Sequence, residues 1–289
     1  MVRRVINAFN RVYRSTPSPR LRRLYYRIFS CVVRDRITRT TVDGLTYELD
    51  LGEVIDLAIY LQSYEPDVTS AIRQYCRPGM TVFDIGANIG AHTLPFGKIV
   101  GPAGKVFAFE PTEYAYGKLH RNLLLNSFPW VSAIRVALGD TNVTSVSVSF
   151  RSSWRTDNSR ADSASVVDVT RLDDWCARHS IRDVDIVKLD VDGNEFPILM
   201  GGYDIIKRCL PLMLLEVVGP HFEDEATNPF RLLVELHYRF WDAQSGMEYK
   251  SPDDMKALFP PQDWGMTKSI NVVAAVALPE SESLLRGQH

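Results

Sequence analysis

The sequence predicts an α/β fold in which helices cover both faces of a mostly parallel sheet. Between residues 81 and 218, short β-branched or aromatic segments alternate with segments whose apolar residues recur at helical spacing. Such alternation is typical of βαβ units, which place parallel strands side by side. With 45% apolar and 24% charged residues, the composition matches a packed globular protein and excludes a disordered or fibrous chain.

The expected elements follow one another in a regular order. Strands are expected at 81–84, 105–110, 131–138, 166–169, 184–189 and 212–218, with a Ser/Thr-rich strand and loop over 143–165. Helices are expected near 89–100 and over 113–126, 172–179 and 195–208. Residues 230–240 and 270–277 then supply a helix and a closing strand.

Two segments precede this core. Alternating polar and apolar residues over 40–51 predict a β-hairpin, and residues 56–76 predict a helix interrupted at Glu65-Pro66. Residues 2–33 carry apolar side chains at helical spacing on both sides of a Ser-Thr-Pro-Ser-Pro break. We therefore expect four parts, namely an Arg-rich amphipathic N-terminal arm (1–40), a hairpin-and-helix module (41–77), a Rossmann-like α/β domain (78–278) and a disordered tail (279–289).

The charge is distributed unevenly along the chain. Residues 1–40 contain 11 Arg and one acid, Asp35, whereas the remaining residues contain 22 basic and 34 acidic side chains. These counts give net charges of +10 and −12. Basic amphipathic helices can rest on an anionic lipid surface, which is one possible partner of residues 1–40. Packing on the chain's own domain and an organelle transit peptide are the alternatives, and the lack of an aromatic readout motif disfavours nucleic acid.

The cysteines and the apolar runs indicate the compartment. Cys31, Cys76, Cys176 and Cys209 form no CxxC pair, which argues against a zinc ribbon or a disulfide framework and favours a reducing compartment. No run approaches the roughly 20 apolar residues that a membrane span needs. We expect a cytoplasmic protein, peripheral to the membrane if the N-terminal arm binds lipid.

A strand that runs into a glycine-spaced turn is the most informative feature. Thr81-Val-Phe-Asp-Ile-Gly-Ala-Asn-Ile-Gly90 joins a β-branched and aromatic strand to the start of a helix. Gly86 and Gly90 allow the backbone to approach a ligand, and N–H groups at a helix start favour an anion. The spacing is GxxxG rather than the GxGxxG of dinucleotide-binding proteins, which disfavours an NAD or FAD pyrophosphate.

Acidic residues end the strands that follow. Glu110 ends the second strand, 24 residues after Gly86, where an acid can accept the hydroxyls of a ribose. Asp140 ends the third strand, beside the expected adenine, and the fourth strand runs into Lys188-Leu-Asp-Val-Asp-Gly-Asn-Glu195. Because parallel strands share one carboxyl edge, we expect a ligand crevice at that edge.

Taken together, these motifs resemble those of FkbM-type S-adenosylmethionine-dependent methyltransferases over residues 44–277. The matching pieces are Tyr64-Glu-Pro66, 78–90, 101–111, Asn122, Asn126, Ala137-Leu-Gly-Asp140, Leu172-Asp-Asp-Trp175, 188–195 and Leu215-Glu-Val217. The resemblance implies a class I methyltransferase Rossmann-like fold with a mostly parallel seven-stranded sheet and S-adenosylmethionine as cofactor. It also implies methyl transfer to a hydroxyl, often on a sugar of a polyketide, glycolipid or surface polysaccharide.

The turn, the strand ends and the resemblance together assign the cofactor-binding residues. We expect contacts from Glu65, Asp84, Gly86, Ala87, Asn88, Gly90, Thr93, Glu110, Pro111, Leu138, Asp140 and Asp190. A purely structural role is the alternative for several of them, because Asp84 can cap a helix and Asn88 and Thr93 can bond the local backbone.

The candidate catalytic residues follow the fourth and fifth strands. Asp190 and Asp192 are two residues apart beyond an apolar strand, so we expect them to point the same way and to orient or deprotonate the acceptor. Lys188 is expected beside them, Glu216 must be paired or face the crevice, and His221 is a candidate general base. The alternatives are that Asp192 caps a helix, that Lys188 neutralises its neighbours and that His221 is solvated.

Two positions depart from the family pattern. Asp192 stands where the family usually has Glu, which shortens the side chain by one methylene. Ala91-His92 stands where the family commonly has aromatic residues, and Pro95 falls inside the expected helix and predicts a kink. The histidines lack metal-ligand spacing, so we expect no metal.

Two other functions remain open on the sequence. One is a nicotinamide-dependent oxidoreductase, which binding of NAD without S-adenosylhomocysteine would favour. The other is a non-catalytic methyltransferase-like scaffold that docks through its basic arm, which binding to anionic vesicles without cofactor binding would favour.

Overall fold

A computed structural model describes residues 36–154, 160–260 and 268–277, together with short stretches and single positions between residues 12 and 33. Most of the expected N-terminal arm and the whole of the expected tail, 279–289, lie outside the described residues.

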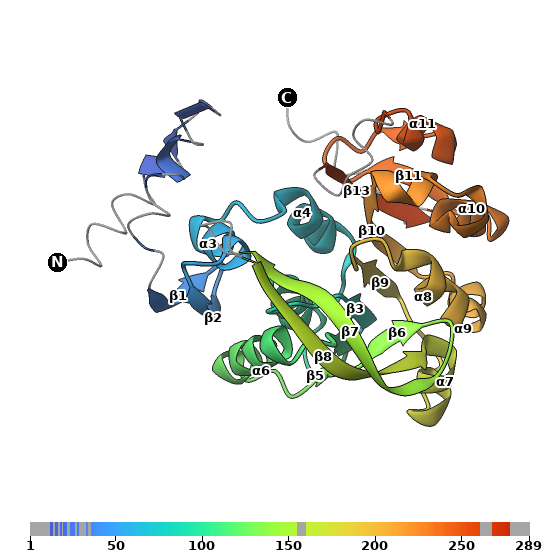
Figure 1. The fold of residues 1–289 in the computed structure, drawn as a ribbon, viewed down its shortest axis with the longest axis horizontal. Helices are drawn as coiled ribbons and strands as arrows, with labels where there is room; N and C mark the ends of the chain where they lie inside the picture. Colours follow the sequence, from blue (N-terminus) through green and yellow to red (C-terminus); the bar gives the residue numbers. More distant parts are fainter. Residues whose placement is uncertain are drawn as a thin grey trace.

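An eight-stranded sheet forms the centre of the described part of the molecule (Figure 1). Its strand order is β12-β11-β13-β10-β9-β3-β4-β5, and the strands from β10 to β5 are parallel. β13, β11 and β12 pair antiparallel at the other end. The strand bounds are β3 Thr81–Ile85, β4 Lys105–Phe109, β5 Val131–Ile134, β9 Ile186–Leu189, β10 Leu212–Val218, β11 Arg239–Asp242, β12 Glu248–Tyr249 and β13 Ser269–Ala275. The predicted mostly parallel sheet is confirmed, with the two-residue β12 as an additional edge strand.

The segment expected as one helix over 230–240 contains a helix and a strand. α10 (Pro229–Glu235) ends early, and the backbone at His237 adopts a left-handed φ of 65°, which turns the chain into β11. When a short helix and a short strand are joined in this way, their apolar residues follow one another at the spacing of a single longer helix, which explains the prediction.

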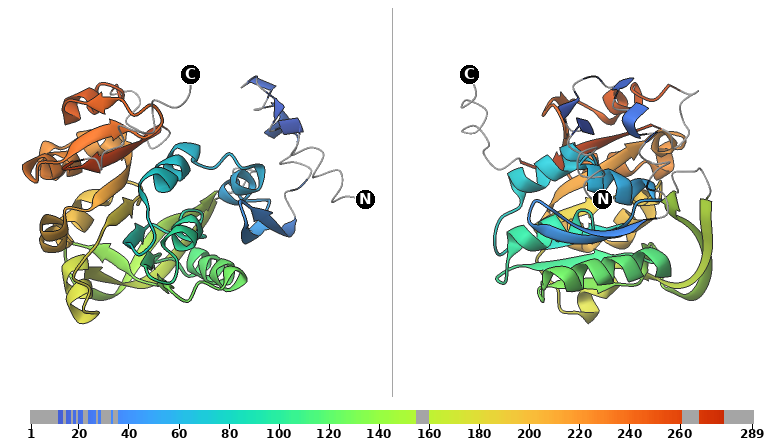
Figure 2. Two further views of the ribbon diagram at one scale, coloured as in Figure 1. Left: turned by 180° about the vertical axis from the view of Figure 1, so that it is seen from behind. Right: turned by 90° about the vertical axis from the view of Figure 1, so that its left-hand side faces the viewer.

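Helices cover both faces of the main sheet (Figure 2). Alternate strand residues enter two different cores, with Val82 in one and Phe83 in the other. The first core contains residues of α4 (Pro66–Tyr75), α5 (Thr93–Val100) and α6 (Glu113–Asn126). The second contains residues of α7 (Leu172–Arg178), α8 (Glu195–Gly201), α9 (Tyr203–Cys209) and α10. The predicted arrangement of helices on both faces is therefore confirmed.

The single strand expected over 131–138 is divided between two sheets. β5 pairs with β4, whereas β6 (Ala137–Gly139) pairs with β8 (Arg160–Arg171) in a second sheet of order β6-β8-β7, where β7 spans Val143–Trp154. Gly139 packs closely on α8, since a Cβ on Gly201 would lie 1.9 Å from the carbonyl oxygen of Gly139. The expectation that Asp140 ends a strand of the main sheet is therefore wrong.

The predicted hairpin and interrupted helix precede the sheet. β1 (Ile37–Val42) and β2 (Leu45–Asp50) are joined by Asp43 and Gly44, whose φ angles of 51° and 76° suit a tight two-residue turn. α3 (Val54–Leu61) is separated from α4 by Glu65, which has a left-handed φ of 33°. Pro66 starts α4, where a missing N–H costs no hydrogen bond.

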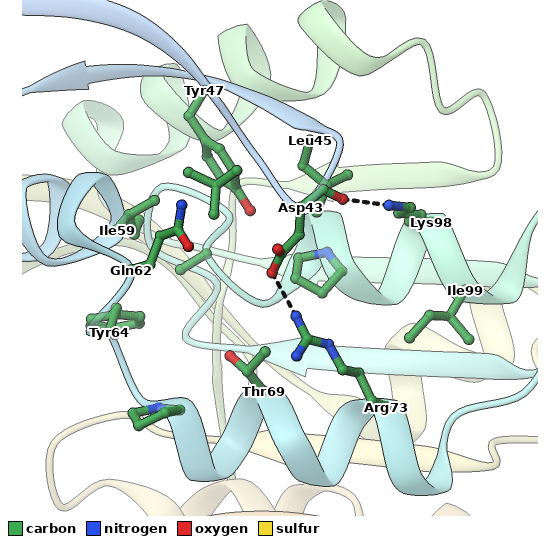
Figure 3. A pocket seen from close by; sticks show the side chains of 14 residues that line it. Asp43, Leu45, Tyr47, Ile59, Gln62, Tyr64, Thr69, Arg73, Lys98 and Ile99 are labelled. Carbon is green, nitrogen blue, oxygen red and sulfur yellow. Dashed lines mark hydrogen bonds and ion pairs between the residues drawn. The ribbon is translucent and has the colours of Figure 1, made fainter. Parts of the chain in front are cut away.

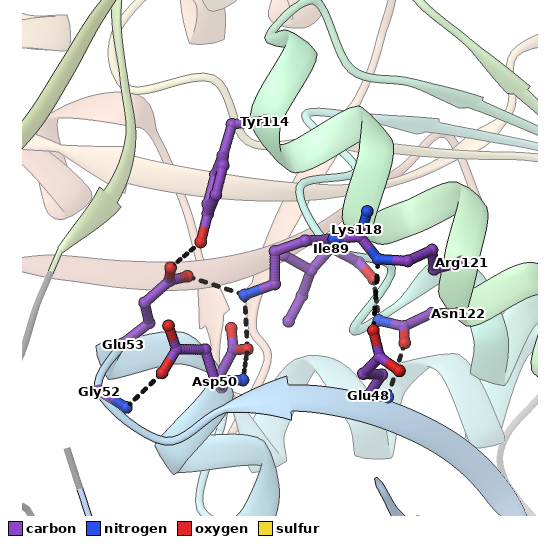
Figure 4. Close-up of polar contacts among 10 residues, drawn as sticks. Glu48, Asp50, Gly52, Glu53, Ile89, Tyr114, Lys118, Arg121 and Asn122 are labelled. Atoms are coloured by element: carbon purple, nitrogen blue, oxygen red, sulfur yellow. Dashed lines mark hydrogen bonds and ion pairs between the residues drawn. The ribbon is translucent and has the colours of Figure 1, made fainter. Parts of the chain in front are cut away.

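Polar side chains of α6 hold this N-terminal module against the sheet (Figure 4). The side-chain oxygen of Asn122 accepts from the N–H of Glu48 at 2.8 Å, and its nitrogen donates to the carbonyl of Ile89 at 2.9 Å. Because Ile89 belongs to the glycine turn, the contact connects the hairpin directly with that turn.

A buried cation with two acids lies one turn earlier on α6. Lys118 donates to Glu53 at 2.8 Å and to Asp56 at 2.5 Å, and all three side chains are buried. Tyr114 also donates to Glu53. Burial raises the pKa of Asp56 to about 6 although Lys118 opposes the shift. The group depends on Lys118 for its neutrality.

Candidate active site

The glycine turn connects β3 to α5 at the carboxyl edge of the sheet. The N–H groups of Gly86 and Ala87 both donate to the carbonyl of Phe109 at 3.0 Å, which ties the turn to β4. Gly86 has a φ of 78°, and a Cβ there would lie 1.8 Å from the carbonyl oxygen of Asp190. The close approach of the chain beyond β9 therefore requires glycine at this position, a packing reason that the sequence does not reveal.

α5 begins at Thr93, later than the sequence predicts. Pro95 therefore lies in the first turn, where its missing N–H costs no intrahelical bond, and the predicted kink is not required. The hydroxyl of Thr93 donates to Asp84 at 2.5 Å. Asp84 is fully buried, and its second oxygen has no hydrogen-bond partner among the described residues.

Glu110 stands directly after β4 and is 6% exposed. Its carboxylate accepts from the N–H of Asn88 at 3.0 Å and from the N–H and hydroxyl of Thr112 at 2.9 and 2.5 Å. Burial raises the pKa of Glu110, while these donors and the charge of Lys188 oppose the shift. Glu110 therefore supports the glycine turn and retains acceptor capacity for a ligand hydroxyl.

Replacing Glu110 by alanine is expected to weaken the binding of S-adenosylhomocysteine by more than tenfold. Charge-assisted hydrogen bonds to ribose hydroxyls, each worth about 1.5–3 kcal/mol, would be lost. Titration calorimetry of the wild type and the variant measures the change. A Thr112→Val variant, which removes one donor to Glu110, serves as the control and should stay within a few-fold. Unchanged affinity of Glu110→Ala would place the ribose elsewhere.

Lys188 lies at the centre of a group of acids. Strand register places it beside Asp84, and its Nζ lies 3.0 Å from Asp190, 3.7 Å from Asp84 and 3.1 Å from the carbonyl of Gly86. Burial would lower the pKa of Lys188, but the charges of Asp190, Asp84 and Glu65 raise it. Lys188 therefore remains a cation and neutralises this edge of the sheet.

Asp190 and Glu216 form a carboxyl pair beside Lys188. β9 and β10 pair Leu189 with Leu215, so the two acids follow at neighbouring positions. Burial and the charge of Asp190 raise the pKa of Glu216 to about 9. Burial would also raise the pKa of Asp190, but the charge of Lys188 and hydrogen bonds from Lys188 and Glu216 lower it. At neutral pH a protonated Glu216 therefore donates to an ionised Asp190.

Tyr64, Glu65 and His92 approach this group from the N-terminal module and from the start of α5. His92 Nε2 lies 2.7 Å from Glu65, and the rings of Tyr64 and His92 stack with centroids 5.4 Å apart. Burial raises the pKa of Tyr64, as do Glu65, Asp190 and Glu216, which shows that these groups are close in space. The sequence predicts Glu65 as a site residue but misses Tyr64 and His92. The unusual histidine after Gly90 is the signal that marks His92.

The surroundings of His221 and Asp192 do not suit the catalytic roles that the sequence predicts for them. His221 accepts from the N–H of Val218 at 3.2 Å through Nδ1, and its Nε2 donates to Glu195 at 2.5 Å. With both ring nitrogens engaged, His221 has no lone pair left for base catalysis. The chain turns at Asp192, which has a left-handed φ of 55°, so strand alternation does not bring Asp192 to the side of Asp190. The Asp192 side chain is exposed.

The remaining predicted cofactor residues divide into two groups. Pro111 follows Glu110 directly and is half-buried, so it stays at the carboxyl edge of the main sheet. Leu138 lies in β6 of the second sheet and Asp140 follows that strand, where the carbonyl of Asp140 accepts from Arg171 at 3.3 Å.

A cavity of about 540 Å³ lies between the β1–β2 hairpin, α3, α4 and α5 (Figure 3). Its wall is mostly apolar. Arg73 pairs with Asp43 at 2.5 Å, and Lys98 donates to the carbonyl of Asp43. Tyr64 and Ala91 also line the cavity, which therefore adjoins His92.

The carboxyl edge fits S-adenosylmethionine, the cofactor that the resemblance implies. Buried polar atoms are normally hydrogen-bonded, and one oxygen of Asp84 beside the glycine turn has no hydrogen bond among the described residues and faces only Lys188 Nζ at 3.7 Å, so it would suit a donor such as the amino group of the methionine part. Glu110 retains acceptor capacity for the ribose. In the described part of the chain, no group of three or more His, Cys, Asp or Glu side chains is arranged to hold a metal ion. Among the same residues, the helices are too short or too polar to cross a membrane.

The chain is similar to several known proteins. The chain is 25% identical over 154 residues to the 2-O-methyltransferase NoeI of Sinorhizobium fredii, which covers 46% of this chain and 61% of that protein's length. Solved structures that it matches include the methyltransferase FkbM from Methylobacillus flagellatus KT, at 14% identity and a TM-score of 0.41 over 94% of this chain and 59% of that one. Another is a SAM-dependent O-methyltransferase from Thermotoga maritima, at 14% identity and a TM-score of 0.42 over 84% and 78% of the two chains.

The family assignment rests on a match over most of the α/β domain. Residues 84–249, more than half of the chain, match the model of the methyltransferase FkbM domain. The match spans the glycine turn, Glu110 and the Lys188 group. The chain therefore belongs to the FkbM methyltransferase family, with the class I methyltransferase fold and S-adenosylmethionine as its cofactor.

Proposed function

We propose that the chain is an O-methyltransferase whose acceptor is a hydroxyl of a sugar, a glycolipid or a related natural product. The Lys188 group carries this proposal, because it places an ionised Asp190 and a protonated Glu216 next to each other at the carboxyl edge. An ionised carboxylate that retains acceptor capacity suits a polyhydroxyl acceptor, whose hydroxyls can donate to it. The similarity to a 2-O-methyltransferase supports the same choice.

The chain's own residues would orient the acceptor. S-adenosylmethionine, when bound, supplies a methyl group on a sulfonium, and its transfer needs the acceptor oxygen held in line with that methyl. Lys188 and Glu216 both donate to Asp190 and keep it ionised, so that Asp190 can accept a hydrogen bond from a neighbouring hydroxyl of a polyhydroxyl acceptor and orient it.

Product analysis tests this function. The protein is incubated with methyl-labelled S-adenosylmethionine and a panel of monosaccharide glycosides and glycolipid extracts, and products are examined by mass spectrometry and NMR. We expect the label in a methyl ether on a sugar hydroxyl, and an Asp190→Asn variant should lower its rate about 10²-fold or more. Label found instead on nitrogen or on a carboxylate would contradict the proposal.

We further propose that the basic N-terminal arm attaches the enzyme to an anionic membrane surface. The charge of +10 over residues 1–40 supports this proposal. So do Leu21, Leu24 and Ile28, which helical spacing places on one face and whose exposures are 48%, 51% and 48%.

Deleting residues 1–31 keeps the buried Val33 but removes Tyr13 and Tyr26, which pack against the first core. This truncation should abolish sedimentation with anionic liposomes and leave S-adenosylhomocysteine affinity unchanged, at some cost in stability. Binding of the full chain should fall steeply with salt, because such attraction is screened within about 8 Å at physiological ionic strength. A full-length protein that stays in the supernatant at low salt would refute membrane attachment.

A further inference from the structure

Methyl transfer to a hydroxyl requires a proton acceptor, and the carboxylates of the site are poorly suited to that task. Lys188, 3.0 Å from Asp190, keeps the pKa of Asp190 below its usual value although burial opposes the shift. Burial and Asp190 raise the pKa of Glu216 to about 9, so that Glu216 already holds its proton at neutral pH. His221 has both ring nitrogens engaged.

His92 is a titratable side chain of this group with an acceptor nitrogen that no described donor occupies. Its side chain is 3% exposed, and its Nδ1 has no hydrogen-bond partner among the described residues. A carboxylate only accepts, so Nε2 carries the proton and donates to Glu65 at 2.7 Å. This tautomer leaves a lone pair on Nδ1, and the arrangement matches a base that is oriented by a carboxylate.

The position of His92 connects the glycine turn with the cavity. His92 follows Gly90 and Ala91, and Ala91 lines the 540 Å³ cavity together with Tyr64 (Figure 3). Tyr64 stacks on the imidazole and also lines the cavity, so His92 lies next to this space. An acceptor in this cavity would reach the imidazole past the Tyr64 ring.

Several charged or titratable groups face His92 from the elements around it. Glu65 and Tyr64 come from the segment that precedes α4 and contact His92 directly. Asp190 follows β9, and the charge of His92 lowers its pKa. Asp190 in turn interacts with Lys188 on β9 and with Glu216 on β10, and Lys188 also pairs with Asp84 on β3.

We propose that His92 is the general base of the reaction, an inference that rests on the proposed O-methyl transfer. The acceptor oxygen forms a bond to the methyl carbon as the carbon–sulfur bond breaks, and neutral S-adenosylhomocysteine leaves. The hydroxyl proton passes to His92 Nδ1, and Glu65 stabilises the resulting imidazolium before the proton is released to solvent.

The kinetic test compares His92→Gln, Glu65→Gln and a matched control, His120→Gln, on the exposed face of α6. With the sugar that the wild type methylates, His92→Gln should lower turnover by about 10²–10⁴-fold and remove the neutral-range inflection of the pH profile. Glu65→Gln should also lower turnover, because the imidazolium that forms during the reaction loses its carboxylate partner. His120→Gln should match the wild type, and S-adenosylhomocysteine affinity should stay within a few-fold in all three.

A second measurement needs no acceptor. The ¹⁵N signals of His92 in the complex with S-adenosylhomocysteine, assigned by their absence in His92→Gln, should show an unprotonated Nδ1 and a protonated Nε2. An Nδ1-protonated ring, or unchanged turnover and pH profile in His92→Gln, would overturn the proposal. Loss of S-adenosylhomocysteine binding in His92→Gln would instead assign Nδ1 to holding the cofactor. Failure of the wild type to methylate hydroxyls would be a failure of the proposed function and would leave the tautomer test unaffected.

Discussion

Replacing Gly86 by alanine is expected to weaken S-adenosylhomocysteine binding by about a hundredfold or more, because displacements of about 1 Å in a site have effects of this size. The new Cβ would lie 1.8 Å from the carbonyl oxygen of Asp190, a backbone atom that cannot move without shifting the chain beyond β9. Either the glycine turn or the segment beyond β9 must move. Titration calorimetry measures the affinity, and urea unfolding measures the loss of stability.

The matched control for this variant is Gly79→Ala. Gly79 has a similar φ of 86°, but a Cβ there would meet nothing within 4 Å. It should cost only the left-handed backbone strain, about 1–2 kcal/mol, and leave the affinity unchanged. Equal effects of the two substitutions would show that the contact between the turn and Asp190 is unimportant.

Replacing Lys118 by methionine is expected to lower the free energy of unfolding by about 3–5 kcal/mol at neutral pH, because two buried acids would lose their cation. Lys118 lies 2.8 Å from Glu53 and 2.5 Å from Asp56, and both carboxylates are buried. The control is Arg121→Met on the same helix, whose pair with Glu48 at 3.4 Å is half-exposed and worth at most about 1 kcal/mol. A loss no larger than that of the control would contradict the role of the triad.

The pH dependence of this effect has a defined sign. Burial raises the pKa of Asp56 from 3.8 to about 6 in the folded protein, so the folded state binds this proton more tightly than the unfolded state. The contribution of Asp56 to stability is therefore greatest below pH 4 and is lost as the pH rises through 6. Without Lys118 this loss should become larger, so the variant should be least affected in acid. Urea unfolding at pH 5 and pH 8 measures the difference.

The parallel core of the fold is readable from local sequence because each strand is a short apolar run that ends in a polar residue. This rule locates Asp84, Glu110, Lys188 and Asp190, and the register of β3, β9 and β10 brings Asp84, Lys188, Asp190 and Glu216 together. It fails for 131–138, because only the pairing of β6 with β8 removes Asp140 from the main sheet.

The other errors concern contacts between residues far apart in the chain. Glu65 is 27 residues from His92, and Glu195 is 26 residues from His221. Sequence spacing therefore suggests His221 as a base, because it does not reveal that both ring nitrogens are already hydrogen-bonded. It also gives no reason to choose His92, whose importance depends on its contacts with Tyr64 and Glu65.

Titration of the full chain with S-adenosylhomocysteine, and separately with NAD, is the most direct test of the central claim that the carboxyl edge binds the product of a methyl donor. We expect saturable one-to-one binding of S-adenosylhomocysteine and no binding of NAD, because Glu110 accepts ribose hydroxyls while the GxxxG turn is not a pyrophosphate site. Tight binding of NAD with no heat from S-adenosylhomocysteine would contradict the account.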